Sequence, residues 1–300
     1  MLKIKTILEQ MDYEEFIGNT ETDILSPVQS NPDKVNDGNI MWVSDKNKNI
    51  LESIIKGTII CSKDAYSSIG KSKTSCNYII SNTPRLLFTQ ILLNYFQKKI
   101  IHTVSKTASI HQSSIIGENV FIGDFVVIEE NCLIGSNSII GSNTVIKYDT
   151  QIGNEVIIGS NNTIGGIGFG YEKDLDSGAY IQIPHLGNVI IKDKAEIGNN
   201  TCIDRAVMGS TIIEENAKID NLVHIAHGVV IGKNSLIIAN AMIAGSVMIG
   251  ENVWVAPSVS ILNGKSVDDD AVIGMGAVVL KNVEKKQTII GNPGKPLVKK

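Results

Sequence analysis

An isoleucine recurs at every sixth position over much of the chain, and this period restricts the possible folds more than any other feature. Ten consecutive positions at this spacing carry isoleucine, from Ile110 to Ile164. The spacing resumes from Ile191 to Ile203 and from Ile213 to Val279, with isoleucine or valine throughout, so twenty-five anchor positions follow one rule. A short repeat without helical periodicity indicates a solenoid of stacked structural units.

The residues around each anchor predict how one repeat folds. Two positions before the anchor the chain is mostly small or β-branched, as at Val120, Thr144 and Val156. Alternate side chains of a strand share a face, so each repeat reads as a short strand with two inward side chains. Gly, Asn or Asp often follows the anchor, as at Gly117 and Gly135, and we expect it to supply the positive φ of a tight corner.

Three such hexapeptides per coil predict a triangular prism, a parallel β-helix in which residues eighteen apart stack above one another. The anchors place this prism over residues 101–283, followed by a short C-terminal tail, 284–300. The six-residue spacing fails twice, at 165–190 and at 204–212. Insertions in a solenoid leave a corner as loops, often on the binding face, so these two loops are either functional or tolerated surface additions.

The first hundred residues lack the repeat and predict a small α/β domain. We expect a helix over 2–11, strands at 58–61 and 78–80, and a helix over 84–99. Thr83 precedes Pro84, which suits an N-cap followed by a proline in the first helical turn.

Composition excludes several classes of protein. The net charge of −4 and the absence of a long basic run argue against nucleic-acid binding. No uninterrupted apolar stretch is long enough to span a membrane, and residues 1–5 lack the apolar run of a secretory signal, so we expect a cytoplasmic protein. Four cysteines at wide spacing match neither a zinc motif nor a disulfide framework, and we expect reduced thiols.

Among the five histidines, His227 has a positional argument for catalysis. It lies two residues past the anchor Ile225, at an outside corner, and Gly245 lies eighteen residues later at the same point of its own repeat. An imidazole beside the backbone N–H of a glycine one coil on resembles a general base next to an oxyanion donor.

Two other chemistries are possible at these positions. His224 and His227 are three residues apart and could bind a metal, but no third ligand is evident, so we expect none. Cys202 could be a nucleophile, yet no histidine that could serve as its base lies near it in the sequence, so we interpret it as an inert thiol.

Several longer motifs are similar to the UDP-3-O-acylglucosamine N-acyltransferases of lipid A synthesis. The likeness covers nearly the whole chain, including both insertions and the N-terminal domain. The motifs that carry it are Gly168-Phe169-Gly170-Tyr171, Ile183-Pro184, Thr201-Cys202-Ile203-Asp204-Arg205, Lys218-Ile219-Asp220-Asn221-Leu222-Val223-His224-Ile225-Ala226-His227 and Ile243-Ala244-Gly245-Ser246.

This resemblance implies a homotrimer of left-handed β-helices with active sites between neighbouring subunits. His227 matches the family's catalytic base and Gly245 its oxyanion glycine, in a reaction without an acyl-enzyme and without a permanently bound cofactor. The acyl thioester is a co-substrate, carried by acyl carrier protein or coenzyme A. The N-terminal domain, 1–100, is then a nucleotide-binding domain.

The sequence departs from the family pattern in the expected nucleotide site. Trp42 matches the aromatic residue that stacks on uracil, but the Asn and Tyr of typical members are matched by Asp45 and Lys48, which leaves the identity of the base open. A second family histidine falls at Gly264.

The donor site departs from the family pattern as well. The family's C-terminal helices, which help to dock acyl carrier protein, have no counterpart in the sequence. Gly291-Asn292-Pro293-Gly294-Lys295 instead resembles the closing motif of coenzyme A-dependent hexapeptide acetyltransferases. We expect Met275, Gly276, Asn292 and Lys295 to bind the acyl donor.

The interpretation that follows is an N-acyltransferase acting on the amino group of a nucleotide-linked sugar in lipid A synthesis. One alternative is an acyl-coenzyme A-dependent enzyme acting on a nucleotide-linked dideoxy amino sugar of O-antigen or another surface polysaccharide. A second alternative is a non-catalytic β-helix scaffold. His227, Gly245 and both insertions occur together, whereas a scaffold would need only the anchors.

Overall fold

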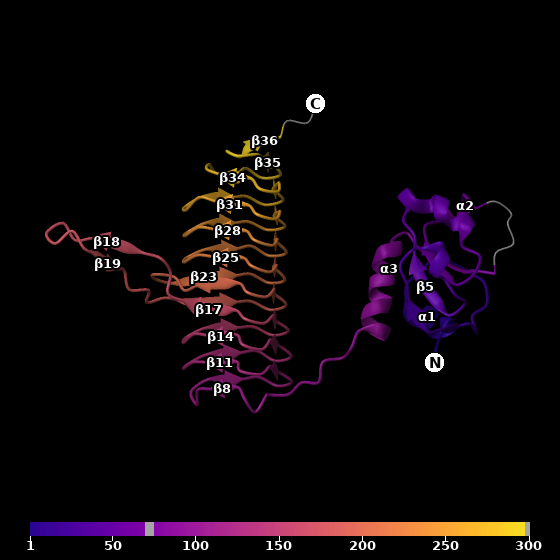
Figure 1. Cartoon of the computed structure of the whole chain (residues 1–300), viewed down its shortest axis with the longest axis horizontal. Helices are drawn as coiled ribbons and strands as arrows, with labels where there is room; N and C mark the ends of the chain where they lie inside the picture. The colour runs from indigo at the N-terminus through magenta and orange to yellow at the C-terminus, as the bar shows by residue number, and fades with distance from the viewer. Residues whose placement is uncertain (70–74, 298–300) are drawn as a thin grey trace. The chain divides into compact units, whose positions relative to one another are not determined.

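The computed structural model describes residues 1–69 and 75–297. The chain divides into two compact units, Met1–Lys99 and Ile100–Lys300, and Figure 1 shows a mixed α/β unit and a stack of β-coils. The last three residues of the expected tail, 298–300, lie outside the described residues.

The N-terminal unit contains a five-stranded sheet in the order β2, β7, β6, β5, β4, in which β2 is antiparallel to β7 and the other neighbours are parallel. Its strands are β1 (Leu2–Lys3), β2 (Glu15–Ile17), β3 (Asp23–Ile24), β4 (Ser26–Pro27), β5 (Asn39–Trp42), β6 (Thr58–Cys61) and β7 (Asn77–Ile80). Its helices are α1 (Ile4–Gln10), α2 (Lys63–Ser67) and α3 (Pro84–Ile91), with 3-10 segments η1 (Pro32–Lys34) and η2 (Asp45–Ser53) and a π-helical segment η3 (Leu92–Phe96).

Both faces of this sheet are buried, which explains why its central strands β5, β6 and β7 are apolar after a polar first residue. On β6, Ile59 packs into one hydrophobic cluster and Ile60 into the other. Parallel strands covered on both sides typically read as continuous apolar runs.

The expected helix over 84–99 is wrong in two details. Its α-helical part ends at Ile91 and a π-helical turn follows to Phe96, so the helix stops before Lys99. Thr83 occupies the N-cap position, but its side chain makes no capping hydrogen bond.

The second unit is a left-handed parallel β-helix with three flat sheets (Figure 1). The first sheet contains β8 (Ser109–Ile110), β11 (Val127–Ile128), β14 (Val145–Ile146), β17 (Thr163–Gly166), β22 (Cys202–Asp204), β25 (His224–Ile225), β28 (Met242–Ile243), β31 (Ser260–Ile261) and β34 (Val278–Val279). The second contains β9 (Ile115–Ile116), β12 (Leu133–Ile134), β15 (Gln151–Ile152), β20 (Asn188–Ile191), β23 (Ser210–Ile213), β26 (Val230–Ile231), β29 (Met248–Ile249) and β32 (Ser266–Val267). The third contains β10 (Phe121–Ile122), β13 (Ile139–Ile140), β16 (Ile157–Ile158), β21 (Glu196–Ile197), β24 (Lys218–Ile219), β27 (Leu236–Ile237), β30 (Trp254–Val255), β33 (Val272–Ile273), β35 (Thr288–Ile290) and β36 (Lys295–Pro296).

Strand pairing confirms the eighteen-residue coil. Ile140 pairs with Ile158, and Ile225 pairs with Ile243. The prism extends beyond residue 283, because β35 pairs in parallel with β33 through Ile273 and Ile289, and Ile289 is buried in the core. Much of the expected tail therefore closes the prism.

The apolar anchors of the three sheets form one continuous hydrophobic core inside the prism. Anchors from Ile122 to Val279 are at most 3% exposed. Hydroxyls in the second inward position are satisfied between coils: Thr144 donates to the carbonyl of Gly159 and accepts from the N–H of Asn162. Polar residues can therefore occupy the interior without an unpaired group.

The expectation that glycines directly after the anchors supply positive φ is wrong. Positive φ falls two residues later, mostly at asparagine, as at Asn119 and Asn137. The glycine after the anchor is needed because adjacent coils approach closely: a Cβ on Gly135 would lie 2.3 Å from the backbone of Gly153.

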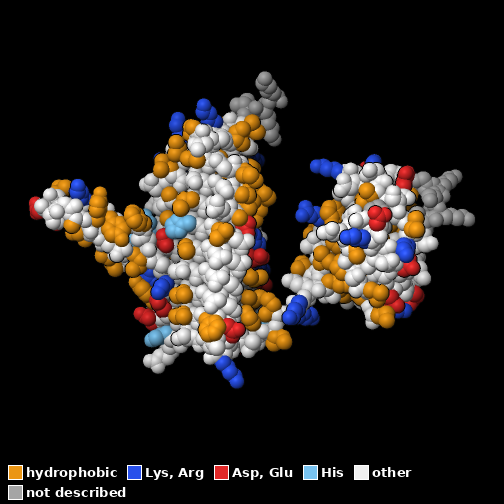
Figure 2. All heavy atoms as spheres, in the orientation of Figure 1, with side chains coloured by type: hydrophobic (Ala, Val, Ile, Leu, Met, Phe, Trp, Pro, Cys, Tyr) orange, Lys and Arg blue, Asp and Glu red, His pale blue; other side chains and the backbone are white. Residues whose placement is uncertain are grey.

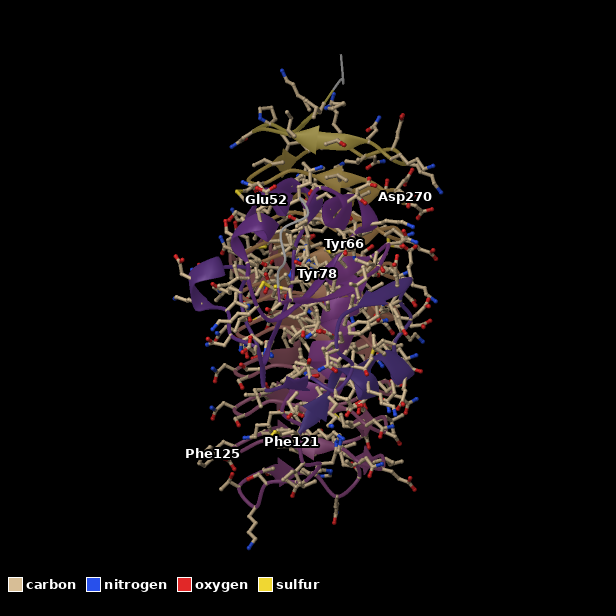
Figure 3. The ribbon with its side chains drawn as sticks, turned by 90° about the vertical axis from the view of Figure 1, so that its right-hand side faces the viewer. Glu52, Tyr66, Tyr78, Phe121, Phe125 and Asp270 are labelled. Atoms are coloured by element: carbon tan, nitrogen blue, oxygen red, sulfur yellow. The ribbon has the colours of Figure 1, made fainter. Side chains whose placement is uncertain are left out.

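The first insertion forms a hairpin of β18 (Tyr171–Lys173) and β19 (Tyr180–Gln182) that projects from the prism. Figure 2 shows hydrophobic side chains gathered over it, and Phe169, Leu175 and Tyr180 are all mostly exposed. Phe125, at a corner with positive φ, also points outward at the edge of the prism (Figure 3).

The helices of residues 1–69 and 75–297 are all too short or too polar to cross a lipid bilayer.

Neighbouring isoleucines of β16 test how much stability the inward column contributes. Ile158 is completely buried, whereas Ile157 is 40% exposed. Ile158→Ala should lower the free energy of unfolding by about 2–5 kcal/mol, because it removes buried methylenes and leaves a cavity. Ile157→Ala should cost clearly less, as measured by denaturant unfolding of both variants. Equal losses would contradict the assignment of the core.

Candidate active site

His227 lies directly against Gly245, one coil further along the prism. A Cβ added to Gly245 would lie 2.7 Å from both Cε1 and Nε2 of the His227 ring. The two residues follow β25 and β28, whose anchors Ile225 and Ile243 pair in register. The corner therefore brings an imidazole edge onto a glycine backbone.

The backbone N–H of Gly245 has no recorded acceptor among the described residues. At many other corners the corresponding N–H is taken by a side chain of the next coil, as the N–H of Ser136 by Asn154 and that of Glu251 by Asp269. At Gly245 this donor stays available to a ligand.

The first insertion covers the other side of His227. A Cβ on Gly168 would lie 3.2 Å from Cβ and Cδ2 of His227 and 2.9 Å from Nε2 of His185. His227 thus lies between two glycine backbones, that of Gly245 and that of Gly168. Gly168 permits this close approach, since a side chain at this position would need to displace one of the two rings.

Arg205 fastens the beginning of this insertion to the prism. Its side chain is completely buried, and it donates from Nε to the carbonyl of Gly165 and from Nη2 to the carbonyl of Tyr148. The guanidinium also lies 3.4 Å from the centroid of the Tyr148 ring. Arg205 belongs to the second insertion, so it links both insertions to the prism.

His185, from the end of the first insertion, is the second imidazole of the site. The residue is 4% exposed, and its ring centroid lies 5.3 Å from that of His227 in an edge-to-face arrangement at 81°. Its Nδ1 is 2.8 Å from the carbonyl oxygen of Ile183.

Asp204 and His224 complete the polar group. Nε2 of His224 lies 3.5 Å from the Asp204 carboxylate, which is mostly buried at the end of β22. Burial raises the pKa of Asp204, while the positive forms of His224, His227 and His185 act in the opposite direction. Burial, followed by the charge of His185, lowers the pKa of His227, and Asp204 opposes this shift. These shifts favour the neutral form of the His227 ring. When the ring does take up a proton, the nearby Asp204 carboxylate stabilises the positive charge.

Two cavities meet at His227 and Phe169. One of about 440 Å³ is lined by polar groups that include Asp204, His224 and Gly245. The other, of about 720 Å³, is largely aromatic and aliphatic, with Tyr171, Tyr180, Phe169, Ile183 and Val207 in its wall. A polar cavity therefore lies beside a larger apolar cavity.

The expected donor residues do not join His227 within one chain. Met275 and Gly276 follow β33 of the ten-stranded sheet, whereas His227 follows β25 of the nine-stranded sheet, so they occupy different corners. Asn292 lies in the turn between β35 and β36, Lys295 begins β36, and both are exposed.

Two of the three expected nucleotide residues line a pocket of the N-terminal unit. This pocket, of about 510 Å³, contains Trp42 and Asp45 but not Lys48. It also contains Arg85, which sequence reasoning missed, and whose guanidinium lies 5.9 Å from the centroid of the Trp42 ring. The hydroxyl of Ser62 donates to Asp45.

The structure changes the reason for dismissing Cys202 as a nucleophile. Cys202 pairs in register with His224, so a basic residue does stand beside it. Burial, and then the charge of Asp204, raise the pKa of the Cys202 thiol, which disfavours the reactive thiolate. Within residues 1–69 and 75–297, no three His, Cys, Asp or Glu side chains are arranged to hold a metal ion.

Comparison with known proteins links this geometry to a family. The model of the bacterial transferase hexapeptide (six repeats) matches residues 113–148 and 210–245. The solved structure of Francisella novicida UDP-N-acetylglucosamine acyltransferase shares the fold, with a TM-score of 0.58 at 23% identity, over 65% of this chain and 70% of that chain.

Two curated relatives are more similar in sequence. UDP-3-O-acylglucosamine N-acyltransferase 1 of Francisella tularensis subsp. holarctica is 51% identical over 81 residues, which span 27% of this chain and only 23% of the relative. UDP-3-O-acylglucosamine N-acyltransferase of Campylobacter lari is 41% identical over 261 residues, covering 83% of this chain and 80% of the relative. The chain belongs to the UDP-3-O-acylglucosamine N-acyltransferase family of hexapeptide-repeat β-helix proteins.

Proposed function

We propose that this protein transfers an acyl group from an acyl thioester to the amino group of a UDP-3-O-acylglucosamine-type sugar, a step of lipid A biosynthesis. The observation that carries this proposal is the imidazole of His227 held against the unpaired backbone N–H of Gly245, in a chain of this family.

His227 acts as the general base. Its pKa is lowered by burial, so the ring is neutral near pH 7 and can accept a proton from the amine as the nitrogen attacks the thioester carbonyl. The C–N bond forms, the C–S bond breaks, and the imidazolium returns its proton to the departing thiolate. The Asp204 carboxylate stabilises the imidazolium while it exists.

Gly245 stabilises the tetrahedral intermediate. The developing negative charge on the carbonyl oxygen needs a hydrogen-bond donor already in place, and the free N–H of Gly245 beside the base meets this need. No acyl-enzyme is formed, which agrees with the raised pKa of the Cys202 thiol.

The two cavities suit the two parts of the reaction. The polar cavity around Asp204, His224 and Gly245 receives the amine and the thioester carbonyl. The larger cavity beside it, walled by Phe169 and Tyr180, offers an apolar space for an acyl chain.

We assign nucleotide binding to the pocket of Trp42 and Asp45, where the indole would stack on the base and the guanidinium of Arg85, 5.9 Å from the centroid of the Trp42 ring, offers a positive charge for a phosphate group. The donor, from acyl carrier protein or coenzyme A, contacts Met275, Gly276, Asn292 and Lys295. Because these residues and His227 lie at different corners of one prism, the proposal requires a homotrimer in which neighbouring corners meet. Action in the cytoplasm stays a prediction.

The direct test incubates the purified protein with nucleotide amino sugars and with acyl thioesters of both carriers, and follows release of free thiol. UDP-3-O-acylglucosamine should be acylated. Preference for a dideoxy amino sugar and acyl-coenzyme A would favour the surface-polysaccharide alternative, and absence of thiol release with every pair would refute the enzyme hypothesis.

His227→Ala should lower turnover by about 10²–10⁴-fold, because the general base is lost. The variant should keep the oligomeric state of the wild type, measured by light scattering. His111→Ala is the matched control, since that ring is exposed and bonds only to nearby Ser113. Near-normal turnover of His227→Ala would remove His227 as the base.

Gly245→Ala should reduce turnover strongly while the protein still folds. Gly245 has no left-handed φ, so alanine suits the backbone, but its methyl would force the His227 ring to move. Gly166→Ala is the control, because its methyl meets its nearest neighbour, Thr163, at an ordinary 3.4 Å. Turnover and the unfolding temperature are measured for both variants. If Gly245→Ala and Gly166→Ala had equal turnover, the role of Gly245 as oxyanion donor would be contradicted.

Trp42→Ala should raise the KM for the nucleotide sugar and leave kcat nearly unchanged, because stacking on a base contributes about 1–3 kcal/mol to binding. Trp254→Ala, at the chain's other tryptophan, should leave this KM unchanged. If Trp42→Ala has the wild-type KM, the N-terminal unit does not bind the nucleotide through this residue.

A further inference from the structure

His185 is a buried imidazole with half of its hydrogen-bonding capacity unused. A carbonyl oxygen can only accept, so the 2.8 Å contact with Ile183 requires that Nδ1 of His185 carries the hydrogen. In the neutral ring Nε2 then holds the lone pair, and this atom is buried without a partner among the described residues. A buried polar atom without a hydrogen-bond partner is destabilising, so the position of His185 calls for an explanation other than stability.

The position of the ring supplies that explanation. His185 meets His227 edge to face at 5.3 Å, and the backbone of Gly168 lies against both rings. A methyl on Gly170 would also contact His185, at 3.3 Å. The first insertion therefore packs the imidazole of His185 against that of His227.

No hydrogen bond to the ring of His227 is recorded within the described chain. Asp204, the nearest carboxylate, pairs with His224 instead. A serine-hydrolase-type triad orients its histidine through a carboxylate, but the orientation of His227 here depends on packing. The contacts that restrict it are Gly245 on one side and Gly168 with His185 on the other.

We propose that His185 is a positioning residue for the base, a buried imidazole fixed by the carbonyl of Ile183 that holds the ring of His227 against Gly245. This proposal rests on the function proposed above, in which His227 is the general base.

His185 also affects the charge of the base. Three titratable groups face His227 from the elements packed around it: His185 from the first insertion, Asp204 from β22 and His224 from β25. After burial, the positive charge that His185 carries in its protonated form is the next cause that lowers the pKa of His227, and Asp204 raises it. Replacing His185 by a group without charge should therefore raise the pKa of His227 toward its ordinary value of 6.5.

The experiment compares His185→Phe, which keeps a ring in the site, with His185→Ala, which removes it. His111→Phe, at an exposed histidine, is the control. NMR titration of the histidine ring protons gives the pKa of His227 without any need for activity, and the pH dependence of kcat/KM gives the same quantity in turnover. The acid limb of the profile should move to higher pH in both His185 variants.

His185→Ala should in addition lower kcat by about 10²-fold with a nearly unchanged KM, because a misplaced catalytic group loses its near-attack geometry. His185→Phe should keep most of the turnover. A purely structural role would lower the unfolding temperature but leave the titration of His227 at its wild-type midpoint.

Unchanged titration of His227 in His185→Phe would overturn the proposal, and this variant decides it even where His185→Ala fails to fold. If the wild-type protein transfers no acyl group, the proposed function fails, while the NMR titration still reports whether His185 contacts and tunes His227.

Discussion

The hydrogen-bond ladder between successive coils is the interaction on which the rest of the molecule depends. The N–H of Gly141, for example, donates to the carbonyl of Ile158 in the coil above. Such a ladder closes only if every side of the triangle returns the chain to the same register, so each inward anchor must fill nearly the same volume. This requirement explains why the inward anchors are almost all isoleucine. It also explains why glycine occupies the positions where the backbones of neighbouring coils approach most closely.

The candidate site combines this rigid ladder with the places where it is interrupted. His227 and Gly245 belong to regular coils, so their mutual position follows from strand register. His185 and Gly168 come from the first insertion, and Asp204 ends a strand beside the second. The regular part supplies a fixed pair of groups, and the insertions partly cover His227 and change the electrostatics around it.

The sequence predicted the features that follow from the period: the solenoid, the buried anchors and the stacking of residue 245 on residue 227. It failed where contacts depend on more than the period. The expected isolation of Cys202 was wrong, because the second insertion makes that coil twenty-two residues long and brings His224 beside it. His185 was missed because an insertion carries no register from which its place could be counted. Thr83 was misjudged as a cap because side-chain geometry is not visible in a preference for residue type.

Apart from a bulge between Ile164 and Gly166 where β17 pairs with β22, the strands on either side of the insertions pair in register. Ile152 pairs with Ile191 across the first, although thirty-nine residues separate them, and Ile191 pairs with Ile213 across the second. Chain length at these corners is thus independent of the architecture around them. A loop taken from another β-helix could be exchanged for the β18–β19 hairpin without remaking the interior, which makes this corner the natural place for evolution or engineering to change what the scaffold accepts.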